Sequence, residues 1–430
     1  MSSHKHADAA PLDLSKWRSL PARLIGAGLV VAAAGAVLSF KHDGGRHFAF
    51  SWLVAFMFCL SLCLGSLFLV LVHHLFDAGW SVPIRRFNEH IASLLFPWMA
   101  ILFIPIAIMA PKLYHWMSPA EQAHPDHALT SKWPLLTIPV FYGVSAAVFV
   151  IWWILSHGLR KWSLKQDEVG GAEPTFKMRG YAYWGIVAFA VTLTLAVVMW
   201  MQAQTHEWFS TMYPVIYFAG SAWLALATTY VITMILHRQN VLTEVLHEHQ
   251  YYFIGSLMFA FTVFYAYVHF AQYFIIWNAN MPEETFWYVI REKGTWFYVA
   301  MVIIFGHFFV PFLGLLRIDV KSFFPYMTAI CAWAWLMHFV DLSFNILPVE
   351  SPTGYPFKWA WLDLGCLALM LGVLSKVFLA KFAASAPFPI KDPRLIEAMG
   401  HFHPVPTQIS GGELDETDDL RDAPHAGPAR

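Results

Sequence analysis

Two groups of ionisable residues interrupt the long apolar stretches of this sequence, where each charge costs about 3 kcal/mol or more in lipid. The first group is His73, His74 and Asp77, whose spacing of three and four residues places them on one edge of a helix end. The second group is spread over the last third of the apolar region: His269, His307, His338, Asp341 and Asp363. Histidine gains and loses a proton near neutral pH, so the two groups predict a proton route with one end near each membrane face.

Tyr265 and Gln272 flank His269 at helical spacing, and these three residues are the candidates for lining a quinone. Two alternatives stay open for the histidines. They can hydrogen-bond a neighbouring helix and serve packing alone, with Asp77 capping a helix end. His269 and His338 can instead face each other as axial ligands of a b-type haem, although cytochrome b-like chains usually carry two such pairs and no second pair is evident.

Cysteine usage limits the covalent redox chemistry of the chain. The four cysteines all lie in apolar stretches and none forms a Cys-x-x-Cys or Cys-x-x-Cys-His motif. This excludes c-type haem attachment and argues against iron-sulfur ligation, so no covalently bound cofactor is predicted. The loop 111–134 contains His115, His124 and His127, but their spacing fits no common ligand pattern. We therefore expect a solvated loop there, and no metal site.

The elements that must position these residues are membrane-spanning helices. Hydrophobic residues make up 58% of the 430-residue chain and charged residues only 13%, which a soluble domain of this size could not carry. About 20 apolar residues are needed to cross a bilayer as a helix. Ten stretches meet this length: 20–40, 48–76, 90–110, 134–157, 180–202, 213–237, 251–277, 295–317, 322–346 and 359–382. The sequence predicts an all-α integral membrane protein with one membrane domain.

The distribution of lysine and arginine predicts an orientation. Eighteen of these residues lie on the side that carries both termini, against seven on the opposite side, which predicts that both termini are cytoplasmic. The chain then divides into a cytoplasmic segment 1–19, a membrane domain 20–382 and an extended cytoplasmic tail 383–430 that is rich in proline and acidic residues. The net charge of -1 offers no basic surface for nucleic acid.

Between the seventh and eighth spans, the residues from Asn280 onward look like the start of a helix. Asn280 is the expected cap, a proline and two acids fill the first turn, and the aromatic residues Phe286, Trp287 and Tyr288 follow. This pattern predicts a short helix that lies on the outer membrane face.

Three segments resemble the membrane subunits of alternative complex III, a bacterial quinol:cytochrome c oxidoreductase unrelated to the cytochrome bc complex. They are HHLFDAGWSVPIRR (73–86), HEWFSTMYPVIYFAG (206–220) and FAFTVFYAYVHFAQYFIIWNANMPEET (259–285). The similarity is closest to the shorter of the two polysulfide-reductase-type ten-span subunits, which is lettered F. It covers nearly all of the membrane domain, and residues 276–284 are its most specific part.

The resemblance implies two four-helix bundles, spans two to five and six to nine, flanked by spans one and ten. It also implies a bacterial cytoplasmic membrane and partners that include a second ten-span subunit, iron-sulfur subunits and c-type haem subunits. Menaquinol or another quinol would be oxidised in the complex, and this subunit would offer polar half-channels for protons without being catalytic alone. Two other functions stay open from the sequence: a purely structural docking subunit, and a secondary transporter, for which helices interrupted at matching positions of both halves would be expected.

Overall fold

The computed structural model describes residues 17–242 and 245–399. Among these residues it contains helices and no strand, and ten helical segments are long and apolar enough to cross a membrane. The helices of these spans are α1 (Ser19–Asp43), α2 (Arg46–Leu75), α3 and α4 (Val82–Ala92, Ala100–Leu113), α7 (Ile138–Val169), α8 (Glu173–Trp200), α9 (Tyr213–Arg238), α10 (Glu248–Ala279), α12 and α13 (Trp296–Val302, Val310–Gly314), α14 (Phe324–Ile346) and α15 (Ala360–Ala383). The predicted all-α, ten-span architecture is confirmed.

Shorter helices occupy the connections. They are α5 (Pro119–Ala123), α6 (His127–Ser131), α11 (Pro282–Arg291) and α16 (Leu395–Ala398), together with 3₁₀ turns at Gly79–Ser81, His115–Met117, Gln202–Gln204, Asp319–Ser322, Leu347–Val349 and Phe357–Trp359. Several spanning helices are longer than the predicted apolar stretches, for example α8, which begins at Glu173 and not near residue 180. The difference arises because polar helix ends project beyond the apolar length that the sequence marks.

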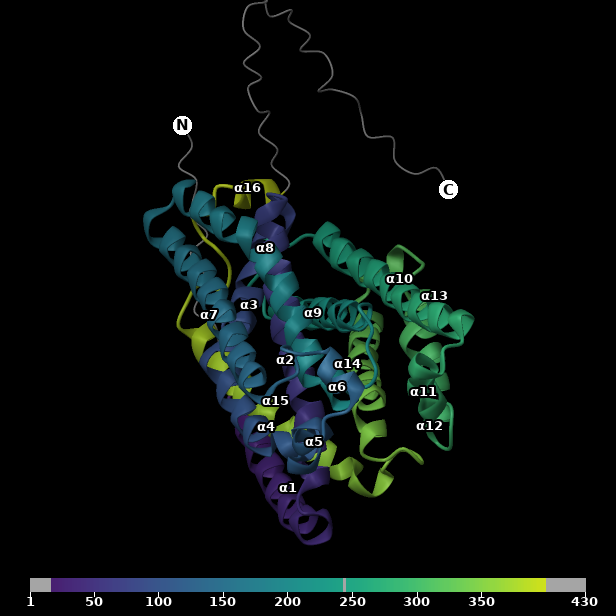
Figure 1. The fold of residues 1–430 in the computed structure, drawn as a ribbon. Coiled ribbons are helices and arrows are strands. Elements are labelled where there is room, and N and C mark those ends of the chain that lie inside the picture. Colours follow the sequence, from purple (N-terminus) through teal and green to yellow (C-terminus); the bar gives the residue numbers. More distant parts are fainter. Residues whose placement is uncertain (1–16, 243–244, 400–430) are drawn as a thin grey trace, which may run out of the picture.

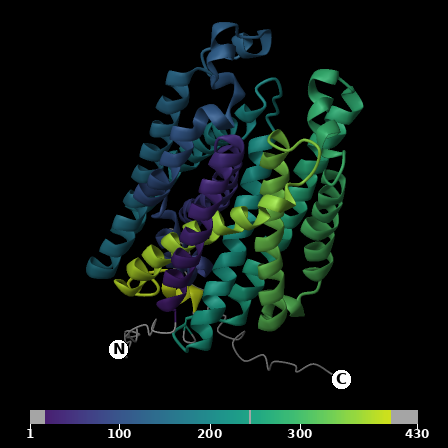
Figure 2. The ribbon, with the colours of Figure 1, turned by 90° about the horizontal axis from the view of Figure 1, so that it is seen from below.

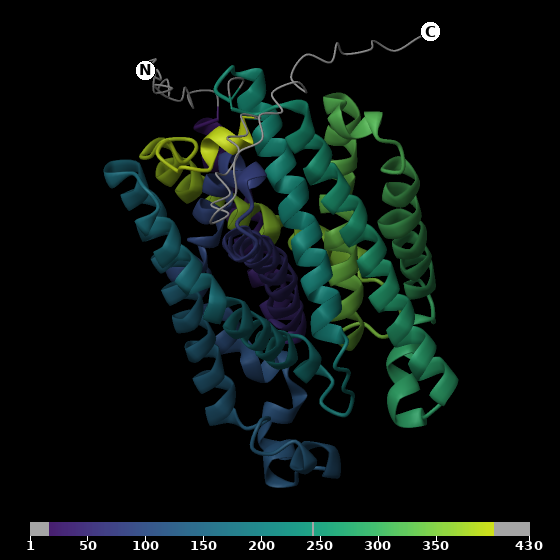
Figure 3. The same cartoon turned by 90° about the horizontal axis from the view of Figure 1, so that it is seen from above.

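The spanning helices form two four-helix bundles, one from α2, α3–α4, α7 and α8 and the other from α9, α10, α12–α13 and α14 (Figures 1 and 3). Helices α1 and α15 pack along each other and against α2, on the flank of the first bundle (Figure 2). We call the side that carries Ser19 and the C-terminal residues 384–399 the terminal face, and the opposite side, with α5, α6 and α11, the distal face.

The two bundles meet where α2 crosses α9. A Cβ added to Gly65 of α2 would lie 2.1 Å from the backbone oxygen of Ser221 on α9, so only glycine fits at this crossing. The residues of α2 are apolar on nearly all faces of the helix, and α2 is the most buried of the spanning helices. Small residues at such crossings let helix backbones approach closely in lipid, where dispersion contacts replace the hydrophobic effect.

The third and eighth spans are interrupted by π-helical turns. Leu95–Met99 separates α3 from α4, with Phe96 outside helical geometry, and Ile303–Phe309 separates α12 from α13. In the eighth span the cause is Pro311, which lacks the N–H that would bond the carbonyl four residues earlier. That carbonyl belongs to His307, so the interruption lies at one of the candidate site residues.

Residues 384–399, which we call the C-terminal strap, fold back over the terminal face. The Ile390 N–H donates to Asp167, Lys391 donates to the Glu168 carbonyl, and Gln250 donates to the Ala398 carbonyl at 2.7 Å. This part of the predicted extended tail is therefore packed on the chain itself. Its remainder, 400–430, and residues 1–16 lie outside the described residues.

The α2–α9 crossing gives a direct test of the packing. Replacing Gly65 with valine inserts a Cβ into the Ser221 backbone, so we expect the two bundles to separate and the protein to lose about 1–3 kcal/mol of stability. The measurement is the thermal unfolding midpoint of the purified protein in detergent. Gly180→Val is the matched control, because no atom lies within 4 Å of the position of its added Cβ. Equal midpoints for the two variants would contradict the assigned crossing.

Candidate functional site

The carboxylate of Asp341 is the centre of a buried polar cluster in the distal half of the second bundle. The Tyr265 hydroxyl donates to Asp341 Oδ1 at 2.8 Å, and the Asn345 amide donates to the same oxygen at 3.1 Å. His269 Nε2 lies 3.7 Å from this oxygen. Tyr265 and His269 are four residues apart on α10, and Asp341 and Asn345 are four apart on α14, so each helix presents both groups on one face.

His307 of the eighth span lies against this cluster. Its ring stacks on Tyr265, with centroids 3.8 Å apart, and its other side contacts Trp223 of α9 at 4.4 Å. The imidazole is fully buried, and neither ring nitrogen has a hydrogen-bond partner among the described residues. The π-helical turn at Ile303–Phe309 therefore presents a titratable group with both nitrogens available to bound water.

His338 connects the cluster to the first bundle. Its Nε2 lies 2.8 Å from Ser61 Oγ on α2, and the Ser61 hydroxyl also donates to the Phe58 carbonyl at 2.8 Å. Both bonds form together when His338 carries its proton on Nε2. The ring packs against α9 at Gly220, where an added Cβ would lie 2.8 Å from it. The Nδ1 atom of His338 is buried without a partner.

Asp363 lies nearer the distal surface, at the start of α15. The Tyr355 hydroxyl is 3.5 Å from its carboxylate, and the carboxylate is buried. Glu350, just beyond α14, contacts the His47 imidazole of α2. Burial raises the pKa of Glu350 to about 7, although Arg46 acts in the opposite direction. Asp363 and Glu350 are thus two further acids with restricted exposure in the distal half.

The first group of candidates is only partly brought together. His73 and His74 are buried side by side at the terminal end of α2, with ring centroids 4.7 Å apart. His73 Nδ1 lies 2.6 Å from Ser81 Oγ and its Nε2 lies 3.2 Å from Arg85, whereas neither nitrogen of His74 has a partner within 17–242 and 245–399. Asp77 is half-exposed and forms ion pairs with other helices.

Those ion pairs belong to a buried charge network under the C-terminal strap. Asp77 pairs with Arg179 at 2.6 Å and with Arg394 at 2.8 Å. Arg394 also pairs with Asp392, which in turn lies 2.7 Å from Arg85. Burial alone would raise the pKa of Asp392, but Arg85 and Arg394 outweigh it and hold this pKa well below its usual range.

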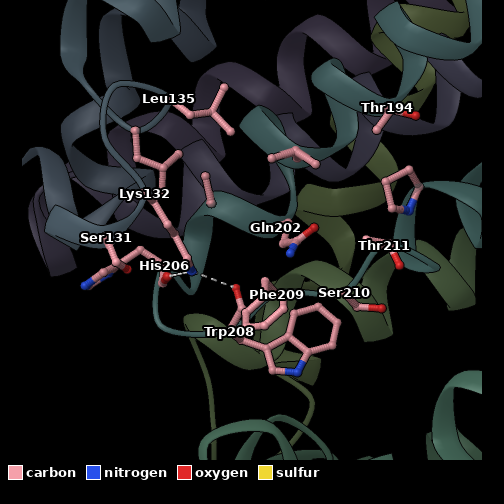
Figure 4. A pocket seen from close by; sticks show the side chains of 14 residues that line it. Ser131, Lys132, Leu135, Thr194, Gln202, His206, Trp208, Phe209, Ser210 and Thr211 are labelled. Carbon is pink, nitrogen blue, oxygen red and sulfur yellow. Dashed lines mark hydrogen bonds between the residues drawn. The ribbon is translucent and has the colours of Figure 1, made fainter. Parts of the chain in front are cut away.

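The residues predicted to line a quinone lie together on α10. Tyr265 and Gln272 are buried, and Gln272 accepts from Ser210 and donates to Tyr288, both at 2.8 Å. Ser210 borders a mostly apolar cavity of 470 Å³ on the distal side, between the loop before α7 and the ends of α8 and α9 (Figure 4). Ser210 therefore links Gln272 to this cavity.

The short helix α11 holds the distal end of α14 in place. The predicted helix is present, but Asn280 ends α10 in a left-handed conformation and Met281 takes the N-cap position. Arg291 of α11 is buried and donates to the backbone carbonyls of Phe344 and Asn345. Burial lowers the pKa of Arg291 to about 9, so the guanidinium stays charged at neutral pH.

The distal and terminal groups are separated by an apolar gap. His73 follows Ser61 by twelve positions on α2, which corresponds to about 18 Å along the helix. Ser66 lies within this gap, and its buried hydroxyl has no hydrogen-bond partner among the described residues. The site thus consists of two separate polar groups of residues, with Ser66 between them.

Sequence reasoning did not find several members of these networks. Ser61 and Asn345 are ordinary polar residues within apolar helices, and only the tertiary packing reveals what they contact. The spacing of Arg85 and Glu89, four residues apart, could have marked a buried ion pair, which the structure shows at 2.8 Å. Asp392 gives no signal in a proline-rich tail.

No family model matches the chain, and no curated protein compared with it matches either. The resemblance of segments 73–86, 206–220 and 259–285 stays a prediction.

The charge network predicts the effect of removing Asp392. Asp392→Asn removes the carboxylate that lies 2.7 Å from the buried Arg85 and leaves Glu89 as the remaining ion-pair partner, so the loss should not exceed the about 3–5 kcal/mol that breaking a buried ion pair costs. Because the pKa of Asp392 is depressed, its contribution is present above the usual range of an aspartate and is lost as pH falls. Thermal unfolding in detergent at pH 7 measures the loss. Asp319→Asn is the control, because Asp319 is exposed and pairs with Arg317, which is also exposed. Equal midpoints for the two variants would refute the network.

Glu350 predicts a pH effect of the opposite sign. Its folded-state pKa of about 7 exceeds that of an unfolded glutamate, so folding binds a proton and stability falls as pH rises from about 4.5 to 7. Glu350→Gln should remove this part of the pH dependence. Thermal midpoints of both proteins, measured across that range, test it; parallel curves would show that Glu350 titrates normally.

Proposed function

We propose that the chain is a non-haem membrane subunit of a quinol-oxidising respiratory complex of the alternative complex III type, and that it conducts protons. The observation that carries this proposal is the buried distal cluster on the eighth and ninth spans. His307 stacks on Tyr265, whose hydroxyl bonds to Asp341. On the same helix as Asp341, His338 contacts Ser61 of the first bundle. Titratable groups are costly within a membrane, because each one must be kept neutral or paired, so a purely structural core would contain fewer of them.

The distal half-route runs from Glu350 and His47 past Asp363 and Tyr355 to the Asp341 cluster. Within the cluster, Tyr265 supplies a hydroxyl that bonds to the carboxylate, and His269 and His307 contact the tyrosine ring. Imidazole and carboxyl groups exchange protons through hydrogen bonds and intervening water, and the unpartnered nitrogens of His307 and His338 are where such water can bind.

The terminal half-route consists of His73 and His74, with Ser81 and Arg85. The C-terminal strap covers this end, since Asp392 reaches Arg85 directly. On the proposed orientation, with both termini cytoplasmic, protons enter or leave the cytoplasmic side beneath the strap. Ser66 lies where the two half-routes must meet.

In this proposal the electron-transferring groups reside elsewhere. The described cysteines are free and buried, and His269 and His338 contact different partners, Asp341 and Ser61. Iron-sulfur and c-type haem subunits and a second ten-span subunit would carry electrons from menaquinol or another quinol. The membrane would be the cytoplasmic membrane of a bacterium.

A purely structural docking role is the second candidate. The buried network of Arg85, Asp392 and Arg394 favours it, because such a network orders the terminal face whether or not protons move. This role predicts that deleting the subunit disrupts assembly, while substitutions in the distal cluster leave turnover unchanged. A transporter working alone would instead be active without partner subunits.

Substitutions at the distal cluster test the proposal. In the intact complex in proteoliposomes, Asp341→Asn and His338→Ala should each lower proton release per electron and slow coupled turnover by about 10²-fold. The reason is that each removes a group that gives and takes a proton. Asp319→Asn, an exposed acid on the terminal face, should leave both quantities unchanged. Unchanged stoichiometry and rate in both cluster variants, with normal assembly, would support the docking role and refute proton conduction.

A further inference from the structure

Three potential metal ligands from separate segments meet on the distal face. They are Glu121 of α5, Asp126 just before α6, and His206 in the connection between α8 and α9. One ligand atom from each lies within 4.8 Å of the others. Eighty residues separate Asp126 from His206 in the chain, so the cluster exists only because of the fold.

The local structure fixes the direction of each group. Asp126 caps α6 with one carboxylate oxygen, which accepts from the Leu129 N–H, and its other oxygen lies 3.1 Å from His206 Nε2. Lys132 holds the backbone of His206 by donating to its carbonyl (Figure 4). His206 is buried, while the two acids are partly exposed, so the cluster opens to solvent on the side of the acids.

Two more donors lie at the edge of the cluster. His115 Nδ1 is 3.8 Å from Glu121 Oε2, and Glu207 Oε1 is 3.9 Å from His206 Nε2. A small rotation of either exposed side chain would bring its ligand atom close enough to serve as the fourth ligand. Imidazole nitrogen together with carboxylate oxygen is a donor set that Zn²⁺ accepts, at about 2.0–2.2 Å from each atom.

The amide of Gln204, two residues before His206, is a buried polar group that lacks a partner in the described part of the chain. Gln204 is 3% exposed, and neither its oxygen nor its nitrogen has a hydrogen-bond partner among the described residues. It borders a cavity of 280 Å³ that His115, His206 and Glu207 also line. A metal-bound water in this cavity would satisfy the amide, because buried polar groups are rarely left unpaired.

A second gathering of ligand types, His42, Asp43 and His47, does not offer the same chemistry. The carboxylate of Asp43 already accepts from the Ser39 hydroxyl and from the backbone N–H groups of Gly45, Arg46 and His47. Its lone pairs are used in ending α1 and starting α2. Asp126, in contrast, has one oxygen directed at His206 and away from its cap.

We infer that Glu121, Asp126 and His206 bind one Zn²⁺, with His115 or Glu207 as the fourth ligand. The ion would join two segments. One is the loop with α5 and α6, which belongs to the first bundle, and the other is the connection that leads into α9, the first helix of the second bundle. Its role is structural, and it is independent of the proposed proton route.

The test is zinc binding to the full-length chain, purified in detergent and stripped of metal with a chelator. After incubation with Zn²⁺ and gel filtration, we expect elemental analysis to find one ion fewer per chain in Asp126→Asn and in Glu121→Gln than in the wild type. Calorimetric titration should show at least a 100-fold loss of affinity at this site. Asparagine retains an oxygen to cap α6, so Asp126→Asn isolates the loss of the ligand charge.

Glu283→Gln is the matched control, because Glu283 is an exposed acid on the same face, in α11 and outside the cluster. It should bind zinc like the wild type. Zinc should also raise the thermal midpoint of the wild type and of Glu283→Gln, and not that of the two cluster variants. The inference is overturned if the wild type binds no zinc or if Asp126→Asn and Glu121→Gln retain the full count and affinity.

Discussion

The contact between α2 and α9 at Gly65 and Ser221 determines what the rest of the molecule can do. Because no side chain separates the two backbones there, the bundles lie close enough for Ser61 of one to reach His338 of the other, which Gly220 accommodates. Lipid supplies no hydrogen bonds, so a polar residue in either bundle must find its partner inside the protein. The close approach makes such partners available across the bundle interface.

The two ends of the molecule satisfy their polar groups in different ways. On the terminal face, oppositely charged residues pair directly, as Arg85 does with Glu89 and Asp392, and the C-terminal strap supplies one of the acids. In the distal half, hydroxyl, amide and imidazole groups surround the Asp341 carboxylate, and several nitrogens have no hydrogen-bond partner among the described residues. A paired network favours one fixed arrangement, whereas unpartnered groups leave room for water and for changes of protonation.

Much of the fold could be predicted from the sequence, because span length and apolar composition are local properties. The distal candidates on α10 and α14 could also be placed together, since helical spacing puts Tyr265 and His269, or His338 and Asp341, on one face. Asp77 shows the limit of this reasoning: its spacing matches the histidines, but arginines from other segments attract it away from them. Likewise, the histidines of the loop 111–134 have no informative spacing, and the residue that completes the cluster there, His206, is distant in the chain.

Hydrogen bonds from Arg291 connect α11 to the interior of the protein. Its guanidinium lies at the negative end of the α14 dipole and donates to the carbonyls of Phe344 and Asn345. The side-chain amide of Asn345 in turn donates to the Asp341 carboxylate. A helix on the surface is thus joined by two residues to a carboxylate in the core. The position of α11 and the orientation of the Asp341 carboxylate are therefore set by one continuous series of hydrogen bonds.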